Sequence, residues 1–318
     1  MTVPVRRLLF LSLAALIGIV PAHAEDKAPA ASEPAAAPSQ PPPLPFHTIE
    51  GYGGGAITPI AYLVNPPPEG QTLGLPAAAF SYVSLADKSL IALTLTETLL
   101  GRFELGIGAD QLSLGTLPGD IQGYTGVNIG TNSLWLNSFN LRVLALPENS
   151  FDLPLPALTT GVQFKYNYGI DGINDSLGGA LNTIGYQRPY GADFTLTATK
   201  AIIIPEWERP LILSAGGRGS DSNSLGFLGF GNRWSVTFEG NVVLIPIDNW
   251  VVAYEFRQNG NSYGTIPPLL RGVDNWNAFD ISYMVGSHID IVAGDGIFGN
   301  IANTTADSAW WLHFKYEL

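Results

Sequence analysis

The sequence contains no cysteine and few charged residues. Without cysteine, the protein can have neither a disulfide scaffold nor a thiolate metal site, and no lipid can be attached to a cysteine at a processed N-terminus. Charged residues make up 13% of the 318 residues, whereas about 25% is usual in soluble domains. After the N-terminus, no apolar run reaches the roughly 18 residues that a helical span requires. These features argue against both a soluble domain and a helical membrane protein.

The N-terminus is typical of an export signal. Arg6 and Arg7 precede the apolar run Leu8 to Val20, and Ala22-His23-Ala24 matches a small-residue cleavage site. We predict that residues 1–24 are a signal peptide that is removed; the alternative, an uncleaved anchor helix, would have a short apolar run for a span. Removing the two arginines changes the formal net charge from −12 to −14. This acidic charge argues against nucleic acid as a partner.

A period of two residues dominates the rest of the chain and predicts β-strands. Between Trp234 and Gln258, apolar and polar residues alternate on both sides of a break at residues 246–249, which is the pattern of a hairpin. Twelve such segments follow residue 76. They are Ala77–Leu85, Ser89–Thr98, Arg102–Leu112, Leu134–Leu146, Leu158–Tyr168, Ala192–Ile203, Pro210–Arg218, Trp234–Leu244, Trp250–Gln258, Asn277–Val285, His288–Ile297 and Ser308–Leu318.

The connections between these segments alternate in length. Long connections follow the odd-numbered segments from the third onward, whereas most connections after even-numbered segments are short. Two connections do not fit this alternation. Residues 86–88 form a short connection at the end where the loops are long, and residues 147–157 form a long connection at the end where the turns are short. An even number of strands, with tight turns at one end and long loops at the other, is typical of bacterial outer-membrane barrels. A soluble sandwich has no reason to separate its loops by length.

Aromatic residues favour the same geometry. If the odd-numbered segments run outward, Trp135, Tyr168, Trp234, Trp276, Trp310 and Trp311 lie near the outer rim, and Trp207, Trp250 and Tyr316 near the inner rim. Such girdles mark the two membrane interfaces, and strands can span lipid only as a closed sheet. We therefore predict an all-β fold for residues 77–318, a transmembrane, antiparallel, up-and-down β-barrel of about 12 strands in the outer membrane of a Gram-negative bacterium. Its expected partners are outer-membrane lipid and the barrel-insertion machinery.

Two segments precede the predicted barrel. Residues 25–45 are rich in alanine and proline, which predicts a flexible or polyproline-like linker. Residues 46–76 are rich in glycine and proline, but no apolar strand precedes the glycines and no Lys-Ser/Thr pair follows, so they do not form a phosphate loop. We expect these glycines to let the backbone pass close to other structure, at or in the periplasmic mouth. The residues assigned to this plug or mouth segment are Glu50, Gly51, Gly53, Gly54, Gly55 and Pro59.

Charged residues fall on one face of the predicted strands, which would line the lumen. The signs are mixed, so the side chains can either pair and support the wall or form a ladder that guides solutes. Both interpretations stay open. Twelve strands should leave a narrow lumen, between the filled interior of eight strands and the aqueous pore of sixteen. The residues assigned to the lumen are Arg102, Glu104, Asp110, Arg142, Lys165, Arg218, Glu239, Glu255, Arg257 and Asp280.

Two predicted outer loops contain the apolar stretches Leu225–Phe230 and Ile266–Leu270. Exposed apolar loops promote aggregation, so we expect these to fold inward or to pack on each other. They could form a lid or an apolar binding patch at the mouth, or simply pack together. A third loop, Asp171 to Asp175, has oxygen ligands that suit calcium, but its spacing is too short and incomplete for a known calcium loop. We therefore expect no bound metal and no cofactor.

Recognisable catalytic motifs are lacking. The histidines after the predicted signal peptide are His47, His288 and His313. His288 falls at a predicted periplasmic turn and His313 near the outer end of the last strand, and neither has an obvious serine partner at the depth of the lipid interface. No G-x-S-x-G motif occurs. We predict that the protein is not an enzyme, with lipid hydrolysis as a distant alternative.

Several short motifs together resemble one bacterial family. They are Thr48-Ile49-Glu50-Gly51, Gly53-Gly54-Gly55, Thr58-Pro59-Ile60-Ala61, Gly161 to Tyr166, Ala198-Thr199-Lys200, Leu225 to Gly231, Glu255-Phe256-Arg257 and Trp276 to Asp280. In this order, over about residues 46–318, they resemble the exported outer-membrane barrel family catalogued as the domain of unknown function number three thousand and thirty-four. The resemblance implies an outer-membrane barrel and implies nothing about a substrate. The chain departs from the family pattern in its alanine- and proline-rich linker and in lacking a proline soon after Arg257.

These observations favour a narrow channel for small solutes, with gating left open. The alternative is a sealed structural or interaction barrel that displays its outer loops or anchors a periplasmic partner through residues 25–45. The sequence does not identify a solute, and it does not determine whether the lumen is open or what the oligomeric state is.

Overall fold

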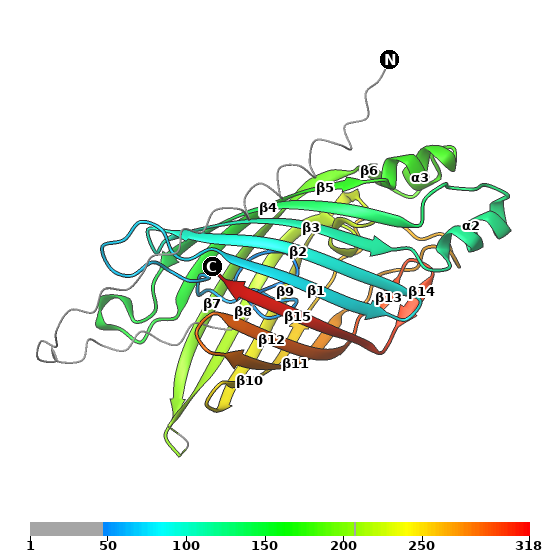
Figure 1. Ribbon diagram of the computed structural model, residues 1–318. Coiled ribbons are helices and arrows are strands. Elements are labelled where there is room, and N and C mark those ends of the chain that lie inside the picture. Colours follow the sequence, from blue (N-terminus) through cyan, green and yellow to red (C-terminus); the bar gives the residue numbers. More distant parts are fainter. Residues whose placement is uncertain (1–46, 207) are drawn as a thin grey trace, which may run out of the picture. The chain divides into compact units, whose positions relative to one another are not determined.

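The protein is represented by a computed structural model that describes residues 47–206 and 208–318. The predicted signal peptide and linker, residues 1–45, and Trp207 of the predicted inner girdle lie outside these residues. Twelve long strands follow one another around a single antiparallel sheet (Figure 1). They are β1 (Ala77–Leu85), β2 (Lys88–Leu99), β3 (Phe103–Ser113), β4 (Ser133–Leu146), β5 (Ala157–Tyr168), β7 (Tyr190–Ile204), β8 (Arg209–Ser222), β9 (Phe230–Ile247), β10 (Trp250–Arg257), β11 (Trp276–Val285), β12 (Ile289–Ile297) and β15 (Ala309–Glu317).

The sheet closes on itself, because every one of these strands has two neighbours. β9 pairs with both β8 and β10, and β15 pairs with both β12 and β1. The predicted closed, antiparallel, up-and-down barrel of twelve strands is therefore confirmed. The largest differences in bounds are at the end of β8, which continues to Ser222, and at the start of β9, which begins at Phe230. The residues added there show no clear apolar alternation, so the sequence pattern gave no sign of them.

The connections also have the predicted parity. Those after β3, β5, β8, β10 and β12 are long and lie at one end of the barrel, here named the loop end; those at the opposite, turn end are short apart from residues 147–156, which contain the helical turn η2 (Ser150–Asp152). The long loops hold short elements that were not predicted. They are α2 (Leu117–Thr125), α3 (Ile170–Ser176), α4 (Ala180–Thr183), η3 (Ser224–Gly226), β6 (Tyr186–Arg188), β13 (Gly299–Ile301) and β14 (Thr304–Ala306).

The outer face of the barrel wall is apolar. On β15, Trp310, Leu312, Phe314 and Tyr316 are exposed, and each alternates with a buried residue. The same alternation leaves Val236 of β9 85% exposed. Such a face suits hydrocarbon rather than water. Within residues 47–206 and 208–318, no helix has the length and apolarity needed to cross a membrane.

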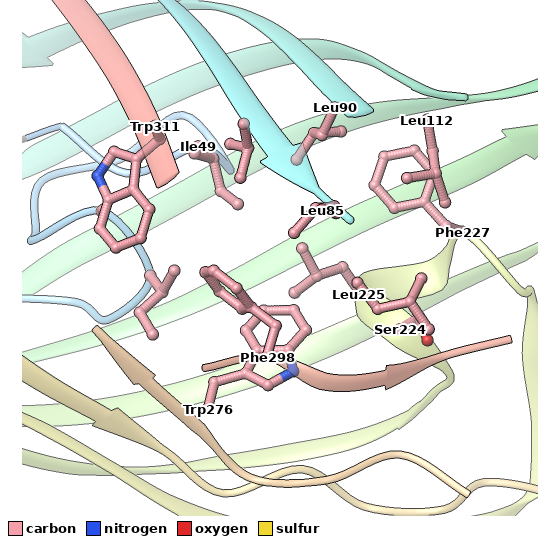
Figure 2. A pocket seen from close by; sticks show the side chains of 14 residues that line it. Ile49, Leu85, Leu90, Leu112, Ser224, Leu225, Phe227, Trp276, Phe298 and Trp311 are labelled. Carbon is pink, nitrogen blue, oxygen red and sulfur yellow. The ribbon is translucent and has the colours of Figure 1, made fainter. Parts of the chain in front are cut away.

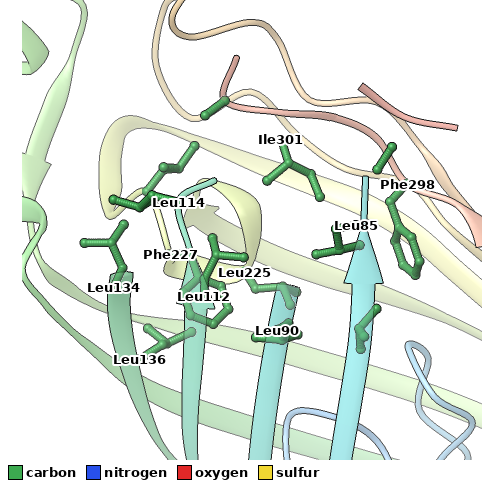
Figure 3. Packing of buried hydrophobic residues seen from close by; sticks show 14 of the residues in the cluster. Leu85, Leu90, Leu112, Leu114, Leu134, Leu136, Leu225, Phe227, Phe298 and Ile301 are labelled. Atoms are coloured by element: carbon green, nitrogen blue, oxygen red, sulfur yellow. The ribbon is translucent and has the colours of Figure 1, made fainter. Parts of the chain in front are cut away.

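The interior is more apolar than the sequence predicted. Near the loop end, Leu85, Leu90 and Leu112 of the wall pack against Leu225 and Phe227 of a long loop, as Figure 3 shows. A second, smaller cluster surrounds Ile60 near the turn end. The interior is more apolar than predicted because the long loops fold inward, where their apolar residues require apolar partners on the wall. The charged layer that the sequence predicted therefore lies between two apolar layers.

Candidate functional site

Residues 47–64, named the plug below, lie inside the barrel against the inner face of the wall. The plug makes two tight reversals, with bridges between His47 and Gly53 and between Gly54 and Pro59. Its side chains are almost all buried, including Tyr52 at 0% exposure. Residues 47–64 of the predicted mouth segment thus lie within the lumen, whereas most of residues 65–76 are exposed or only partly buried.

Glycine is required where the plug and the wall approach most closely. A Cβ atom on Gly55 would lie 2.3 Å from the Glu255 carboxylate, and a Cβ atom on Gly106 of β3 would lie 2.0 Å from the carbonyl oxygen of Gly51. Neither distance leaves room for a side chain. The predicted close backbone approach therefore accounts for a glycine in the plug and for another on the wall that faces it.

Glu255 of β10 binds three successive backbone amides of the plug. Its Oε1 accepts hydrogen bonds from the amides of Ala56 at 2.6 Å and Ile57 at 3.2 Å. Its Oε2 accepts one from the amide of Thr58 at 2.8 Å and one from the Thr58 hydroxyl. These bonds satisfy buried backbone donors of the plug and fix the reversal at residues 55–58.

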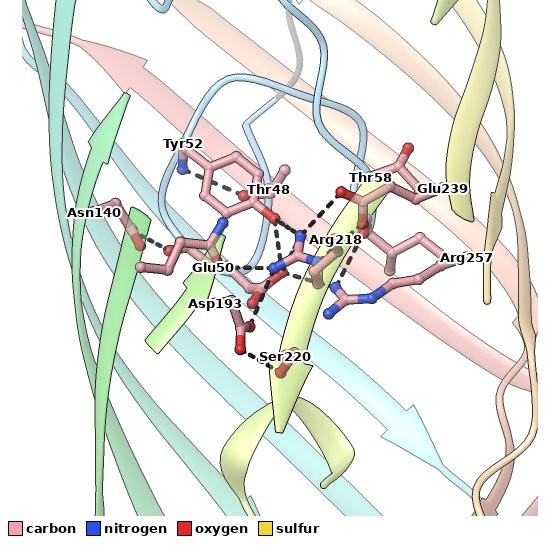
Figure 4. A network of polar contacts seen from close by, with 12 residues as sticks. Thr48, Glu50, Tyr52, Thr58, Asn140, Asp193, Arg218, Ser220, Glu239 and Arg257 are labelled. Carbon is pink, nitrogen blue, oxygen red and sulfur yellow. Dashed lines mark hydrogen bonds and ion pairs between the residues drawn. The ribbon is translucent and has the colours of Figure 1, made fainter. Parts of the chain in front are cut away.

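Glu50 of the plug is surrounded by three cations of the wall, which Figure 4 shows in part. Lys165 Nζ lies 2.6 Å from its Oε1, and Arg257 Nη1 and Arg218 Nη2 lie 2.8 and 3.5 Å from its Oε2. The Tyr52 hydroxyl donates a further bond to Oε2 at 2.7 Å. Burial opposes ionisation of Glu50, but the charges of Arg218, Lys165 and Arg257 outweigh it and hold the pKa of this carboxyl well below its ordinary value.

A third anchor is the pair formed by Arg142 of β4 and Glu104 of β3, which lie 2.8 Å apart. Arg142 donates hydrogen bonds to the carbonyl oxygens of Gly53, at 3.0 Å, and Ile60. Glu104 accepts bonds from the amides of Gly53 at 3.1 Å and Val64 at 2.8 Å. The pair thus satisfies backbone donors and acceptors of the plug, which could not otherwise be buried without a large cost.

The structure brings most of the predicted lumen residues together. Arg218 lies 3.1 Å from Glu239 and 3.2 Å from Asp193, and Lys165 lies 2.6 Å from Asp193. Asp193 was not assigned to the site, although its position in the predicted strand 192–203, two residues before the inward Thr195, was a usable signal. The residues that contact the plug or this network are Glu104, Arg142, Lys165, Arg218, Glu239, Glu255 and Arg257.

The other three assigned residues are less closely tied to this network. Asp280 accepts a bond from the Trp311 indole at 2.9 Å, and its carboxyl group also interacts with that of Glu255. Asp110 is buried in β3, and no residue that the structure describes bonds to its Oδ1. Arg102 is exposed in the turn before β3, where it donates to the carbonyl oxygen of Leu144. Its assignment to the lumen was incorrect, because the strand begins one residue later and the alternation does not extend into the turn.

His313 has a serine partner inside the barrel, whereas the prediction from the sequence concerned only a partner at the depth of the lipid interface. Its Nδ1 lies 2.7 Å from the hydroxyl of Ser81, and both side chains are buried. Among the described residues, its Nε2 has no hydrogen-bond partner. These residues therefore show a serine and a histidine in contact, without a third group that orients the ring.

The apolar loop segments both fold inward. Leu225 and Phe227 of the first segment, and Leu270 of the second, belong to the apolar cluster at the loop end. Backbone strain accompanies this arrangement, since Ser224 and Leu225 have φ angles of 47° and 63°. The segment Asp171 to Asp175, considered above as a calcium loop, lies in helix α3, where Asp171 accepts a bond from the Tyr186 hydroxyl. Among residues 47–206 and 208–318, no group of three or more His, Asp or Glu side chains is placed to hold a metal ion.

The interior contains small cavities, of which two lie near the network described above. The first is apolar and lies between the plug residues Ile49 and Ile57, the wall residue Trp276 and the loop residues Leu225 and Phe227 (Figure 2). The second is polar. It lies against β8, β9 and the end of β10, and its lining includes Arg218, Arg257, Ser220, Ser222, Ser235 and Thr237.

A profile of the family described as "Protein of unknown function (DUF3034)" matches residues 45–315. No curated protein matches the sequence. Among solved structures, the KdgM porin aligns with a TM-score of 0.46 at 10% identity, over 76% of this chain and 99% of that chain. The COG4313 outer membrane channel from Pseudomonas putida F1 has a TM-score of 0.40 at 12% identity, over 82% and 100%. Outer membrane phospholipase A from Escherichia coli has a TM-score of 0.33 at 9% identity, over 77% and 92%.

Proposed function

The chain belongs to the DUF3034 family, proteins of unknown function, and we propose that its barrel is an outer-membrane channel for small solutes that the plug holds closed. In this proposal residues 1–24 direct export and are removed, residues 25–45 link to the barrel in the periplasm, and the turn end faces the periplasm. Lipid surrounds the apolar outer face, and the barrel-insertion machinery places it there.

The polar character of the contact between plug and wall carries this proposal. Glu50, Glu104, Arg142, Glu255 and Arg257 all bond across that contact. If the plug leaves, these groups line a lumen that water and solutes can occupy. A wall built only to enclose a permanent core would be expected to contact it through apolar side chains, because buried ion pairs contribute little net stability.

Release of the plug would not require the barrel to unfold. Each hydrogen bond between plug and wall exchanges for one to water, so its net contribution is only about 0.5–1.5 kcal/mol, or about 1.5–3 kcal/mol where a charged group takes part. The strand ladders of the wall are unaffected by this exchange. Undocking is therefore a local opening of lower free energy than global unfolding.

A sealed structural or interaction barrel is the second candidate. It is favoured by the plug residues Ile49, Ala56, Ile57 and Ile60, which join the apolar clusters toward both ends of the lumen. These contacts exclude water and would resist release of the plug. In that case the outer loops, or residues 25–45, would hold a partner. We also propose that the protein is not an enzyme, and an assay of phospholipid hydrolysis by the purified protein tests this.

The experiment is to compare the ionic conductance of the full chain with that of a variant that lacks residues 47–64, in planar bilayers. The full chain should be closed for most of the time, and the deletion variant should show steady, discrete conductance. A synthetic peptide of residues 47–64 should reduce that conductance, whereas a peptide of the same composition in scrambled order should not. Folding of the variant is checked by its heat-modifiable migration on gels. A folded deletion variant that stays silent would instead favour the sealed barrel.

A further inference from the structure

The carboxylate of Glu50 sits where a negatively charged solute would be held. The carboxylate comes from the plug, whereas Lys165, Arg218 and Arg257, which bind it, come from β5, β8 and β10 of the wall. If the plug leaves, Asp193 and Glu239 remain as the carboxylates paired with these cations. Among the groups joined by these ion pairs, three positive charges then face two negative ones, so the vacated position favours one anion.

The polar cavity borders this position. Arg218 and Arg257 line it together with Ser220 and Ser222. Arg257 is 3% exposed, and its Nε donor has no hydrogen-bond partner in the part of the chain that the structure describes. A buried donor of a charged group is costly to leave unpaired, so it marks a place where a ligand would be stabilised.

The apolar cavity adjoins the polar one. Ser224 and Leu225 line both cavities. The guanidinium of Arg257, on the polar side, lies 5.4 Å above the ring of Trp276, which lines the apolar side. A site with a cationic part and an adjacent aromatic and aliphatic part fits a ligand with a charged head and an apolar body.

We infer that Glu50 occupies the site at which the channel binds the carboxylate of a small organic acid, whose apolar body takes the place now lined by Leu225, Phe227 and Trp276. This inference rests on the proposed function, because it requires the plug to leave. The solute and the plug compete for Lys165 and Arg257, so binding of one releases the other.

The size of the apolar cavity requires this competition. Its free volume is about 40 Å³, whereas a cavity that admits benzene in another protein measures about 150 Å³. The missing space becomes available when Ile57 of the plug moves away. Since only the undocked state accepts the ligand, its apparent affinity is reduced by the fraction of molecules that are undocked.

The test uses benzoate, benzamide and acetate as probes, titrated by calorimetry into the full chain in detergent. Benzoate carries the charge and the apolar ring, benzamide lacks the charge, and acetate lacks the ring. We expect measurable binding of benzoate. Benzamide and acetate should bind at least about tenfold more weakly, because each lacks one of the two groups that the site contacts. Glu50→Gln should bind benzoate about tenfold more tightly than the wild type, because its plug competes less well. Arg257→Gln should lose benzoate binding, and Asp248→Asn, in an exposed turn ion pair, should leave it unchanged.

Several results would overturn the inference. Equal binding of benzoate and benzamide would show that no carboxylate site exists, and equal binding of benzoate and acetate would remove the apolar part. A Glu50→Gln variant that binds benzoate no better than the wild type would show that Glu50 has only a structural role. The variant without residues 47–64 distinguishes this inference from the proposed function. If this variant conducts ions but benzoate neither binds nor alters the current, the proposed channel function is supported and the carboxylate site is refuted. If benzoate binds but this variant does not conduct, the proposed channel function is refuted instead.

Discussion

Removal of the charge on Glu255 should undock the plug without disturbing the barrel wall. Glu255→Gln keeps the shape of the side chain but replaces one acceptor oxygen with an NH₂ group, which cannot accept from the amides of Ala56, Ile57 and Thr58. A hydrogen bond to a charged group contributes about 1.5–3 kcal/mol. Loss of about two such bonds weakens docking by roughly 3–6 kcal/mol. Because about 1.4 kcal/mol is a factor of ten, the undocked fraction should rise by about 10²- to 10⁴-fold.

The assay for this prediction uses the absence of cysteine from the chain. Ala61 of the plug is 0% exposed, so Ala61→Cys should react with a membrane-impermeant maleimide only when the plug is undocked. When labelling is slower than redocking, its rate follows the undocked fraction. Asp248→Asn is the matched control, since the Asp248 side chain is 84% exposed and pairs only with Arg209 among the described residues. If Glu255→Gln and Asp248→Asn give labelling rates within about threefold of each other, the anchoring role of Glu255 is refuted.

Three further predictions follow from the same contacts. Gly106→Ala should weaken docking of the plug by about 1–3 kcal/mol, because its Cβ atom would meet the Gly51 carbonyl. Gly119→Ala is the control and should leave docking unchanged, because no atom of the described residues lies close to its Cβ position. The rate of maleimide labelling at Ala61→Cys measures docking in both variants. The pKa of Glu50 is lower in the docked state than its ordinary value of 4.5. The ionised carboxylate therefore contributes fully to docking above pH 4.5, and this contribution is lost as the pH falls through the lowered pKa. Conductance of the wild type should thus rise in acid below about pH 4.5, and a titration in which Glu50→Gln rises equally would contradict this. N-terminal sequencing of the mature protein should begin at Glu25, and an intact N-terminus would contradict the predicted cleavage.

The barrel itself could be predicted from the sequence because its constraints are local and repetitive. A lipid-facing strand must alternate, and the alternation from Leu312 to Leu318 places the charged residues of β15 inside. Loop lengths then gave the strand order, since short turns join antiparallel neighbours. The ends of β8 and β9 were missed where small or polar residues interrupt the alternation. Arg102 was misplaced for a related reason, because a period of two residues does not show where a turn begins.

The arrangement inside the lumen was less predictable because it depends on contacts between distant parts of the chain. The glycines of residues 51–55 indicated close backbone approach but not the partner, and Glu255 lies about 200 residues away from the amides it binds. The mixed charges on the lumen face did not show whether their partners lie on the wall or elsewhere. In the structure, Arg218 has partners of both kinds, because it pairs with Glu239 of the wall and with Glu50 of the plug. No pattern in the sequence distinguishes these two kinds of partner.

Reversible locking of the plug tests the central claim most directly. The amide of Ala61 lies 2.8 Å from the hydroxyl oxygen of Thr199 on β7, so cysteines at these two positions are near enough to be joined by oxidation or by a short thiol cross-linker. In the Glu255→Gln background, Ala61→Cys/Thr199→Cys should conduct ions when reduced, fall silent when cross-linked, and conduct again after release of the link, while each single-cysteine variant should be insensitive. A cross-linked barrel that conducts as well as the reduced one would show that residues 47–64 do not close this channel.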